Sequence, residues 1–333
     1  MSAPAAIASL SLDLDDRWVY LRTRGVPGWA SAPSYLETVA RRALEVLHGA
    51  GVRVTCFSVG RDAAAASGRP ALAALAGAGH EIGNHAFSHG ALGSFATRGE
   101  LELEIARTEE AIHAATGQRP VGFRGPGYTL SAAVVEALVE RGYLYDATVW
   151  PTYLGAVTSR LFMRAHRSGG GRGTAGLFGG ADRVRLPNRP FRWSSAAGEL
   201  VEIPVTTVPF VRFPLQVSYL VALRSASRPL ARHYLRRSLS LCRRCRVEPS
   251  LILHPPDLLG AEDAPDLAFF PAMRRSLAWK REAFRDLLGE LSRWFSVVTL
   301  REHAAAAGAR PDLRTLAAAR LDRRAAAVRP EPA

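Results

Sequence analysis

Carboxylates and imidazoles crowd two short stretches of the 333-residue sequence. In LDLDDRW, Asp13, Asp15 and Asp16 follow an apolar run directly, and in HAFSH the residues His85 and His89 stand four positions apart. Like charges as close as these three aspartates repel one another, so the cluster needs either solvent or a cation. A solvated turn in which an aspartate caps the next element explains the first stretch alone. A metal ion explains both stretches, because carboxylate and imidazole are common metal ligands.

Strand-like and helix-like patterns alternate along the chain, which predicts an α/β fold with a mostly parallel sheet or barrel. In a parallel barrel the carboxyl ends of all strands lie on one rim, and that rim carries the active site. Two histidines and a carboxylate at such a rim form a metal-ligand set with room for water, although HxxxH alone is also typical of paired surface or core histidines. The polar residues that follow predicted strands are Asp13, Asp15, Asp16, His85, His89, Arg124, Asp146 and His254.

The motifs and their order resemble the polysaccharide deacetylases, the group with NodB homology that is also called carbohydrate esterase family 4. SLDLDD resembles the family's first motif and HAFSH its second. RGPGY, from Arg124 to Tyr128, resembles the third motif, and LIL followed by His254 resembles the fifth. The family's Asp-Trp motif has no clean match, because Asp146 and Trp150 lie in that region without being adjacent.

The resemblance implies the fold and its limits. We expect a deformed (β/α) barrel of the NodB-homology type that forms a single domain over residues 1–303. The Gly-rich composition around SGGGRGTAGLFGG predicts an irregular insertion within this domain at residues 155–200. The tail of residues 304–333 is rich in Ala, Arg and Pro, and we expect it to be disordered.

The resemblance also implies a metal site at the first two motifs. Intracellular branches of the family often show D-x-D, in which the first Asp is the base and the second is a ligand. By that pattern Asp13 is the catalytic base, and Asp15 binds a divalent metal, by default Zn²⁺, together with His85 and His89. Asp16 is the alternative ligand.

The remaining catalytic roles follow from the resemblance together with elementary chemistry. Arg124 would orient Asp13, and the backbone N–H of Tyr128 would stabilise the oxyanion beside the metal. His254 would protonate the leaving amine, which departs only as a neutral molecule.

The expected activity is metal-dependent hydrolysis of an N-acyl group, acetyl or formyl, on an amino sugar or on a lipid- or nucleotide-linked sugar precursor. An amidohydrolase acting on a non-sugar amide or cyclic imide is the alternative, and a catalytically inactive carbohydrate-binding module is a third reading. We expect a cytoplasmic protein, because the N-terminus lacks a basic region with a long apolar core and the chain has no apolar run long enough to span a bilayer.

Positive charge is concentrated late in the chain, whose formal net charge is +13. Eight arginines and no acid lie between residues 223 and 247, with arginine at every fourth position from 224 to 236. The stripe Arg224, Arg228, Arg232 and Arg236 predicts either a solvated helix face or peripheral contact with an anionic membrane surface at the inner face of the membrane. No nucleic acid is expected, because no recognition motif accompanies the stripe.

Overall fold

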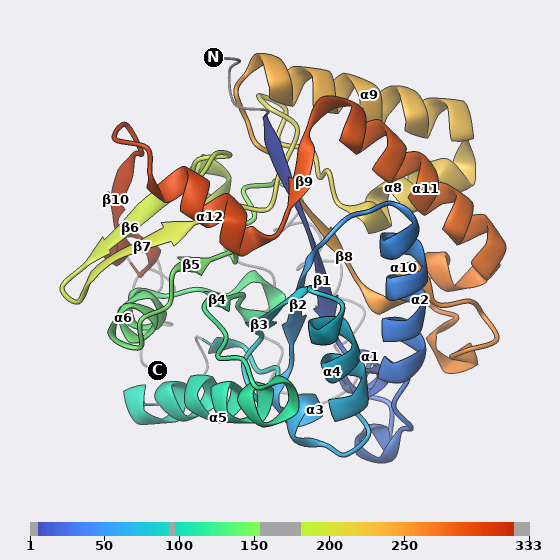
Figure 1. Ribbon diagram of the computed structural model, residues 1–333, viewed down its shortest axis with the longest axis horizontal. Coiled ribbons are helices and arrows are strands. Elements are labelled where there is room, and N and C mark those ends of the chain that lie inside the picture. The colour runs from blue at the N-terminus through green and yellow to red at the C-terminus, as the bar shows by residue number, and fades with distance from the viewer. Residues whose placement is uncertain (1–5, 93–96, 154–180, 323–333) are drawn as a thin grey trace, which may run out of the picture.

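A curved ten-stranded sheet forms the centre of the computed structural model, which describes residues 6–92, 97–153 and 181–322 (Figure 1). The strand order is β10-β6-β7-β5-β4-β3-β2-β1-β8, and β9 also pairs with β1. All pairs are parallel except β6 with β7, so the predicted α/β class with a mostly parallel sheet is confirmed. The strands are β1 (Ile7–Leu14), β2 (Thr55–Ser58), β3 (Glu81–Asn84), β4 (Gly122–Phe123), β5 (Tyr145–Asp146), β6 (Phe191–Ser195), β7 (Gly198–Glu202), β8 (Ser250–Leu253), β9 (Ser296–Val298) and β10 (Thr315–Ala317).

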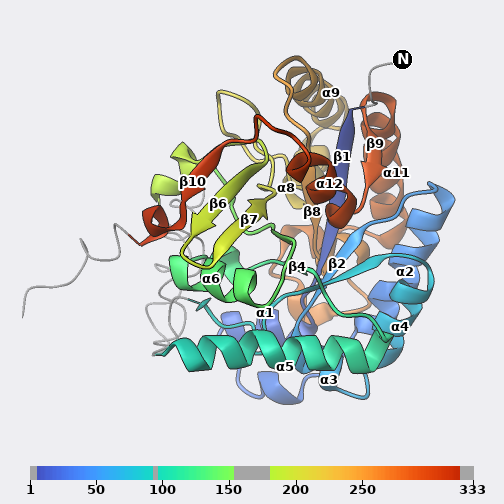
Figure 2. The same cartoon turned by 60° about the vertical axis from the view of Figure 1, so that its left-hand side comes forward.

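Helices pack around the sheet, with α5 along one side and α9 and α11 together at the opposite end (Figures 1 and 2). Leu300 and Ala304 of α12 pack against Phe57 and Tyr145, so this helix fills the concave face near the amino ends of the strands. The helices are α1 (Arg17–Thr23), α2 (Leu36–Gly49), α3 (Gly60–Ala64), α4 (Arg69–Gly77), α5 (Arg98–Thr116), α6 (Ala132–Glu140), α8 (Val217–Ala226), α9 (Arg228–Arg244), α10 (Pro255–Leu258), α11 (Leu277–Trp294) and α12 (Leu300–Gly308).

Local sequence signals set several helix ends. A capping box of Thr97 and Glu100 opens α5, and Gly117 ends the helix with a φ of 72°. The Ala-rich segment 62–78 is divided between α3 and α4. The chain turns between them at Gly68, where a Cβ would lie 2.0 Å from the carbonyl oxygen of Asp62. Only glycine fits this close approach.

The structure corrects two predictions of irregular chain. Strand β6 and most of β7 lie inside the predicted insertion at 155–200, while residues 154–180 lie outside the described residues. The predicted disordered tail contains most of α12, all of β10 and a short 3₁₀ helix (Ala318–Leu321), and residues 323–333 lie outside the description. Strand β10 is ordered because Leu316 pairs with Trp193 of β6 and is buried in the same apolar cluster.

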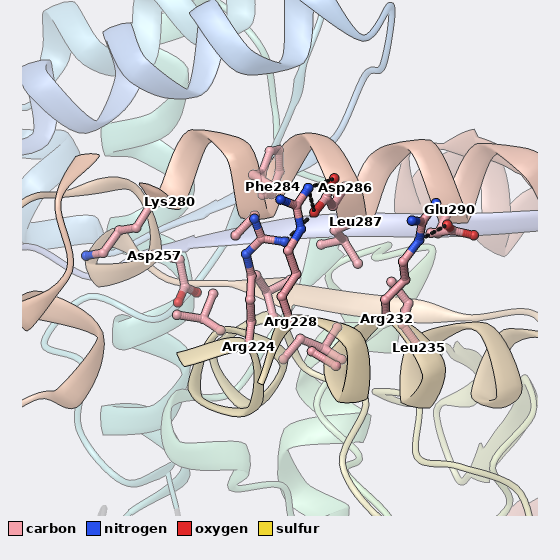
Figure 3. A pocket seen from close by; sticks show the side chains of 15 residues that line it. Arg224, Arg228, Arg232, Leu235, Asp257, Lys280, Phe284, Asp286, Leu287 and Glu290 are labelled. Carbon is pink, nitrogen blue, oxygen red and sulfur yellow. Dashed lines mark hydrogen bonds and ion pairs between the residues drawn. The ribbon is translucent and has the colours of Figure 1, made fainter. Parts of the chain in front are cut away.

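The arginine stripe is an ion-pair row between helices (Figure 3). Arg224 ends α8, and the other three arginines lie on α9, which begins after the N-cap Ser227. Facing acids on α11 also recur every four residues, and the pairs are Arg224 and Arg228 with Glu282 and Asp286, and Arg232 and Arg236 with Glu290. The row therefore pairs all four arginines with acids of the protein itself. Contact of these arginines with an anionic membrane surface stays a prediction. Within the described residues, no helix is both long and apolar enough to cross a bilayer.

The three cysteines are free thiols. Cys56 in β2 and Cys242 in α9 are fully buried, and burial raises the pKa of Cys242 to about 12. A thiol with so high a pKa stays protonated and is a poor metal ligand. The CxxC of Cys242 and Cys245 is therefore part of the packing of α9.

We expect Glu290→Gln to lower the free energy of unfolding by about 1–2 kcal/mol at pH 7, because Glu290 accepts hydrogen bonds from Arg232 and Arg236. The hydrogen bond from Arg236 is the main cause that lowers the pKa of Glu290. The contribution of ionised Glu290 to the free energy of unfolding is therefore fully present above the ordinary glutamate pKa. It is lost as the pH falls through the lowered pKa of the folded state.

Urea denaturation at pH 7 and pH 3 measures this effect. The control Glu282→Gln, whose side chain is 42% exposed, should change the free energy of unfolding by less than about 0.5 kcal/mol. Equal losses in the two variants would show that the row is only a surface feature.

Candidate functional site

Strand register brings the first and last motifs together. Leu12 of β1 pairs with Leu253 of β8, so the next residues, Asp13 and His254, lie side by side at the carboxyl ends of the two strands. His254 Nε2 lies 3.9 Å from Asp13 Oδ2. A parallel pair thus joins two side chains that are 241 residues apart in sequence.

Arg124 ties the end of β4 to the same point. Its side chain is fully buried, and NH1 donates to Asp13 Oδ1 at 2.6 Å and to the Ser11 hydroxyl at 2.7 Å. Nε donates to the carbonyl oxygen of Ala147 at 2.9 Å, and the guanidinium lies 4.3 Å above the ring of Phe57. These contacts fix one carboxylate oxygen of Asp13, and the other oxygen faces His254.

Asp15, His85 and His89 form a candidate metal site. One ligand atom from each lies within 4.8 Å of the others. Asp15 Oδ1 lies 3.5 Å from His85 Nε2 and 3.2 Å from His89 Nε2, yet this buried oxygen makes no hydrogen bond of acceptable geometry. The three atoms therefore converge on a common point. Two imidazole nitrogens and one carboxylate oxygen fit a Zn²⁺-like ion that keeps an open position.

The electrostatics of the cluster suit metal ligands. His85 Nδ1 lies 2.6 Å from the carbonyl oxygen of Arg124, which turns Nε2 toward Asp15. Burial lowers the pKa of His85, although the negative charges of Asp13 and Asp15 act to raise it. A lowered pKa favours the neutral imidazole, which is the form that binds metal. Burial would raise the pKa of Asp15, but the neighbouring His89, His85 and His254 together hold it well below its usual range.

The HxxxH motif lies on a loop after β3. Ala86 and His89 have φ values of 58° and 49°, a left-handed conformation that costs a non-glycine residue free energy. The loop is held by its neighbours: Glu104 of α5 accepts from the N–H groups of Phe87 and Ser88 at 3.0 and 2.8 Å. A guanidinium of α1 also donates to the carbonyls of the loop. The strain therefore orients His89, and the motif spacing alone could not reveal it.

Asp16, the alternative ligand, is used elsewhere. Side chains alternate along an extended chain, so Asp13 and Asp15 share one face and Asp16 points to the other. The Asp16 carboxylate caps α1, accepting from the N–H of Arg17 at 2.7 Å and from that of Tyr35 at 3.1 Å. The structure thus brings Asp15, and not Asp16, to the histidines.

The predicted oxyanion donor is already engaged. The N–H of Tyr128 donates to the carbonyl oxygen of Gly125 at 3.1 Å within the turn Pro126–Tyr128. The Tyr128 hydroxyl accepts from Gln216 Nε2 at 2.8 Å. In this structure the residue contributes a cavity wall through its ring, which stands 4.8 Å from that of Trp150.

Asp146 lies away from His254. It pairs with Glu202 across β5 and β7, and both carboxyl groups are fully buried. Burial raises the pKa of Asp146, and burial together with the neighbouring Asp146 raises that of Glu202 further. The Asp146 side chain accepts from the hydroxyl of Thr148 at 2.6 Å. The pair supports the sheet behind the site. No motif in the sequence indicated that Glu202 would be buried beside Asp146.

Asp257 is the carboxylate that supports His254. Asp257 Oδ2 accepts from the backbone N–H of His254 at 3.0 Å, and Ser218 donates to the same oxygen at 3.0 Å. Behind it, the buried ammonium of Lys280 donates to the carbonyl oxygens of Pro256 and Leu259. Asp257, Ser218 and Lys280 were not among the predicted site residues, although the acid three positions after a helix N-cap is a capping signal.

The groups from the strand ends form the floor of one cavity of about 400 Å³. Asp13, Asp15, His85, His89 and His254 all line it. The walls come from α1, α8, the turn at Tyr128, and the segment that follows α10. Arg124 lies beneath the floor.

Comparisons with known proteins agree with this fold. Residues 16–145 match the family model described as polysaccharide deacetylase. A crystal structure from Mycobacterium smegmatis, of a protein assigned as a polysaccharide deacetylase, aligns with a TM-score of 0.62 at 21% identity and covers 100% of this chain and 98% of that one. At such identity the likeness shows the fold alone. A search of curated proteins finds no match.

Two further structures align less closely and carry no argument. A family 4 carbohydrate esterase from Streptomyces lividans in complex with acetate has a TM-score of 0.35 at 22% identity, covering 50% of this chain and 76% of that one. A pseudoenzyme of the same family from Bacillus anthracis has a TM-score of 0.46 at 12% identity, covering 90% and 66%.

The fold and the arrangement of the site define an α/β protein of the NodB-homology type. The matched segment, residues 16–145, holds His85, His89, Arg124 and Tyr128, and it is similar to the polysaccharide deacetylases. That family consists of hydrolases that act on the carbon–nitrogen bonds of acetylated sugars. Asp13, Asp15 and His254 lie outside residues 16–145. The roles of all the predicted site residues, inside and outside this segment, stay predictions.

We expect Asp15→Asn to weaken Zn²⁺ binding at least tenfold, because a charged oxygen is replaced by a neutral one at the point where the histidines converge. Asp16→Asn should leave the affinity within about twofold and cost about 1 kcal/mol of stability through the weakened N-cap and its bond to Tyr35. Isothermal titration with Zn²⁺ and thermal melting separate the two effects. Metal loss in Asp16→Asn with retention in Asp15→Asn would exchange their roles.

A second prediction concerns Lys280, whose pKa burial lowers to about 8. Between pH 8 and about 10.4 the unfolded chain keeps this proton and the folded chain releases it, so stability rises with pH. We expect the free energy of unfolding of the native protein to gain about 1–3 kcal/mol relative to Lys280→Met over this range. Lys280 is the only lysine in the chain, so no other lysine side chain obscures the trend. A difference that does not change with pH would refute the buried ammonium.

Proposed function

We propose that the protein is a metal-dependent N-deacylase that hydrolyses the acetyl or formyl amide of an amino sugar. The observation that carries the proposal is the cavity floor, where a carboxylate and two imidazoles converge beside Asp13 and His254. The match of residues 16–145 to the polysaccharide deacetylase family supports the same chemistry. That the substrate is an amino sugar carrying an acetyl or formyl amide is part of the proposal.

Asp15, His85 and His89 would hold the ion, and the donor chemistry favours Zn²⁺. When bound, such an ion polarises a carbonyl group and makes water more acidic. The protein's part is to present three ligand atoms with one side open to the cavity. His85 is fixed for this task by the carbonyl of Arg124, and His89 by the strained loop.

Asp13 is proposed as the general base that takes the proton of the attacking water. Arg124 NH1 holds Oδ1 at 2.6 Å, which leaves Oδ2 directed toward the cavity and His254. A charge-assisted hydrogen bond of this length orients the carboxylate, and both partners are buried. Arg124 therefore acts through Asp13 and is a positioning residue.

His254 is proposed as the general acid that gives a proton to the departing amine. Its Nε2 lies 3.9 Å from Asp13 Oδ2, so the proposed acid and base can reach the same scissile bond. Asp257 fixes the backbone of His254 through the hydrogen bond to its N–H. We leave the N–H of Tyr128 out of this mechanism, because it already donates to Gly125.

The alternative functions predicted from the sequence remain proposals, and the site supports them less directly. A non-sugar amide or cyclic imide could use the same acid and base, and a binding protein would use neither. A cytoplasmic location also stays a prediction, as does a precursor sugar as the substrate.

The test is incubation of Zn²⁺-loaded protein with N-acetyl and N-formyl amino sugars, simple amides and cyclic imides, with the released acid measured by mass spectrometry. Asp13→Asn should lower kcat by at least about 10²-fold while the metal stays bound, because the shape is kept and proton acceptance is lost. Glu282→Gln, remote from the cavity, is the matched control.

Full activity in Asp13→Asn would remove Asp13 as the base. Turnover of imides without turnover of sugars would favour the amidohydrolase alternative. Binding of sugars without acid release at any metal concentration would favour the inactive module.

A further inference from the structure

The walls of the cavity differ in chemistry from its floor. The floor carries the carboxylates and imidazoles, whereas most wall side chains are aromatic or aliphatic. The described wall residues are Val19, Tyr20, Thr23, Tyr128, Trp150, Gln216, Ser218, Tyr219, Ala222, Pro256, Phe270 and Ala272, with Gly125 and Gly127 in the turn. Hydroxyl-rich ligands need many polar partners, and this wall offers few.

Charge is the second distinguishing feature. None of the described residues that line the cavity is a lysine or arginine, although the chain has 43 of them. The titratable groups on the floor include Asp13, Asp15 and Asp257. Phosphate and diphosphate groups are normally bound by guanidinium or ammonium groups or by helix N-termini. A nucleotide- or phosphate-linked sugar would therefore bring its anion to a cavity without cationic side chains.

The aromatic rings of the cavity wall form two groups. Tyr20 and Phe270 meet edge to face with centroids 5.2 Å apart. Trp150 lies between Tyr128 and Tyr219, at 4.8 and 6.3 Å. Tyr219 and Phe270 lie outside the segment that matches the family model, so this part of the wall belongs to the later half of the chain.

Two buried donors within these groups lack partners in the described residues. Trp150 is 6% exposed, and its Nε1 has no hydrogen-bond partner. The hydroxyl of Tyr20 is likewise buried and unpaired. An unpaired buried donor is costly, and a ligand oxygen would relieve that cost. Such donors suit neutral acceptors such as a carbonyl or hydroxyl oxygen.

We propose that the substrate is an uncharged amide that carries an apolar group, and that Tyr20, Tyr219 and Phe270 bind this group. That the substrate is an amide rests on the proposed function. That it carries an apolar group rests on the chemistry of the cavity wall alone. The apolar group could be attached in two ways, as an apolar aglycone of an N-acetyl or N-formyl sugar or as a long N-acyl chain. The second way would extend the proposed function from acetyl and formyl groups to longer acyl groups. Both present the same chemistry to the wall, and the experiment separates them.

Binding is measured by isothermal titration with Zn²⁺-loaded Asp13→Asn protein, so that ligands are not consumed. The probes are the methyl and octyl glycosides of N-acetylglucosamine, the methyl glycoside of N-octanoylglucosamine, and UDP-N-acetylglucosamine, each below its micellar concentration. Burying a few methylene groups predicts at least tenfold tighter binding of an octyl probe than of the methyl probe. Whether the octyl glycoside or the octanoyl amide gains this affinity identifies the position of the apolar group.

Phe270→Ser and Tyr219→Ser should each weaken the favoured octyl probe at least fivefold and leave the methyl probe within about twofold. Phe213→Ser is the matched control, because Phe213 is 56% exposed and does not line the cavity. Melting temperatures identify any variant that fails to fold, and either wall variant alone then suffices.

Equal affinity for methyl and octyl probes, or tightest binding of the nucleotide sugar, would overturn this proposal. If no amide is hydrolysed but the octyl preference persists, the proposed function fails and the apolar wall stands. If amides are hydrolysed without an octyl preference, the proposed function stands and the proposed apolar group is refuted.

Discussion

The buried ion pair of Asp13 and Arg124 is the contact on which the site depends. It joins β1 to β4 beneath the cavity, with a separation of 2.6 Å and almost no exposure of either side chain. Removing one partner of such a pair leaves an uncompensated buried charge, which commonly costs about 3–5 kcal/mol. The same arginine orients His85 through its carbonyl oxygen and reaches β5 through Ala147. One residue therefore connects the proposed base, a proposed metal ligand and the centre of the sheet.

The supports behind the cavity come from the later half of the chain. Lys280 of α11 holds the carbonyl oxygens of α10, and Asp257 of α10 holds the backbone of His254. Helix α11 is in turn held to α8 and α9 by the row of arginines and acids. The same helix therefore carries both the acids of this row and the lysine that holds α10.

Much of the site could be predicted from short motifs, because the chemistry needs particular residue types directly after strands. Asp13, Asp15, His85, His89, Arg124 and His254 converge as expected on one rim. The prediction was less successful where backbone geometry decides the outcome. The N–H of Tyr128 donates within its own turn, and the arginines of the stripe pair with acids 54–62 residues further along the chain. Neither partner can be identified without knowing which elements pack together.

The sequence by itself determined the alternation of elements, the order of the motifs, and the side on which Asp13 and Asp15 project, because an extended chain alternates its side chains strictly. It also determined the helix starts that carry a capping box, such as that of α5. Only the tertiary structure decided the rest. Strand β10 is ordered because Leu316 finds the apolar cluster around Trp193, and Asp257 and Lys280 reach the site because α10 and α11 pack behind it. Burial and partnership across long sequence separations are properties of packing, and no local pattern in the chain encodes them.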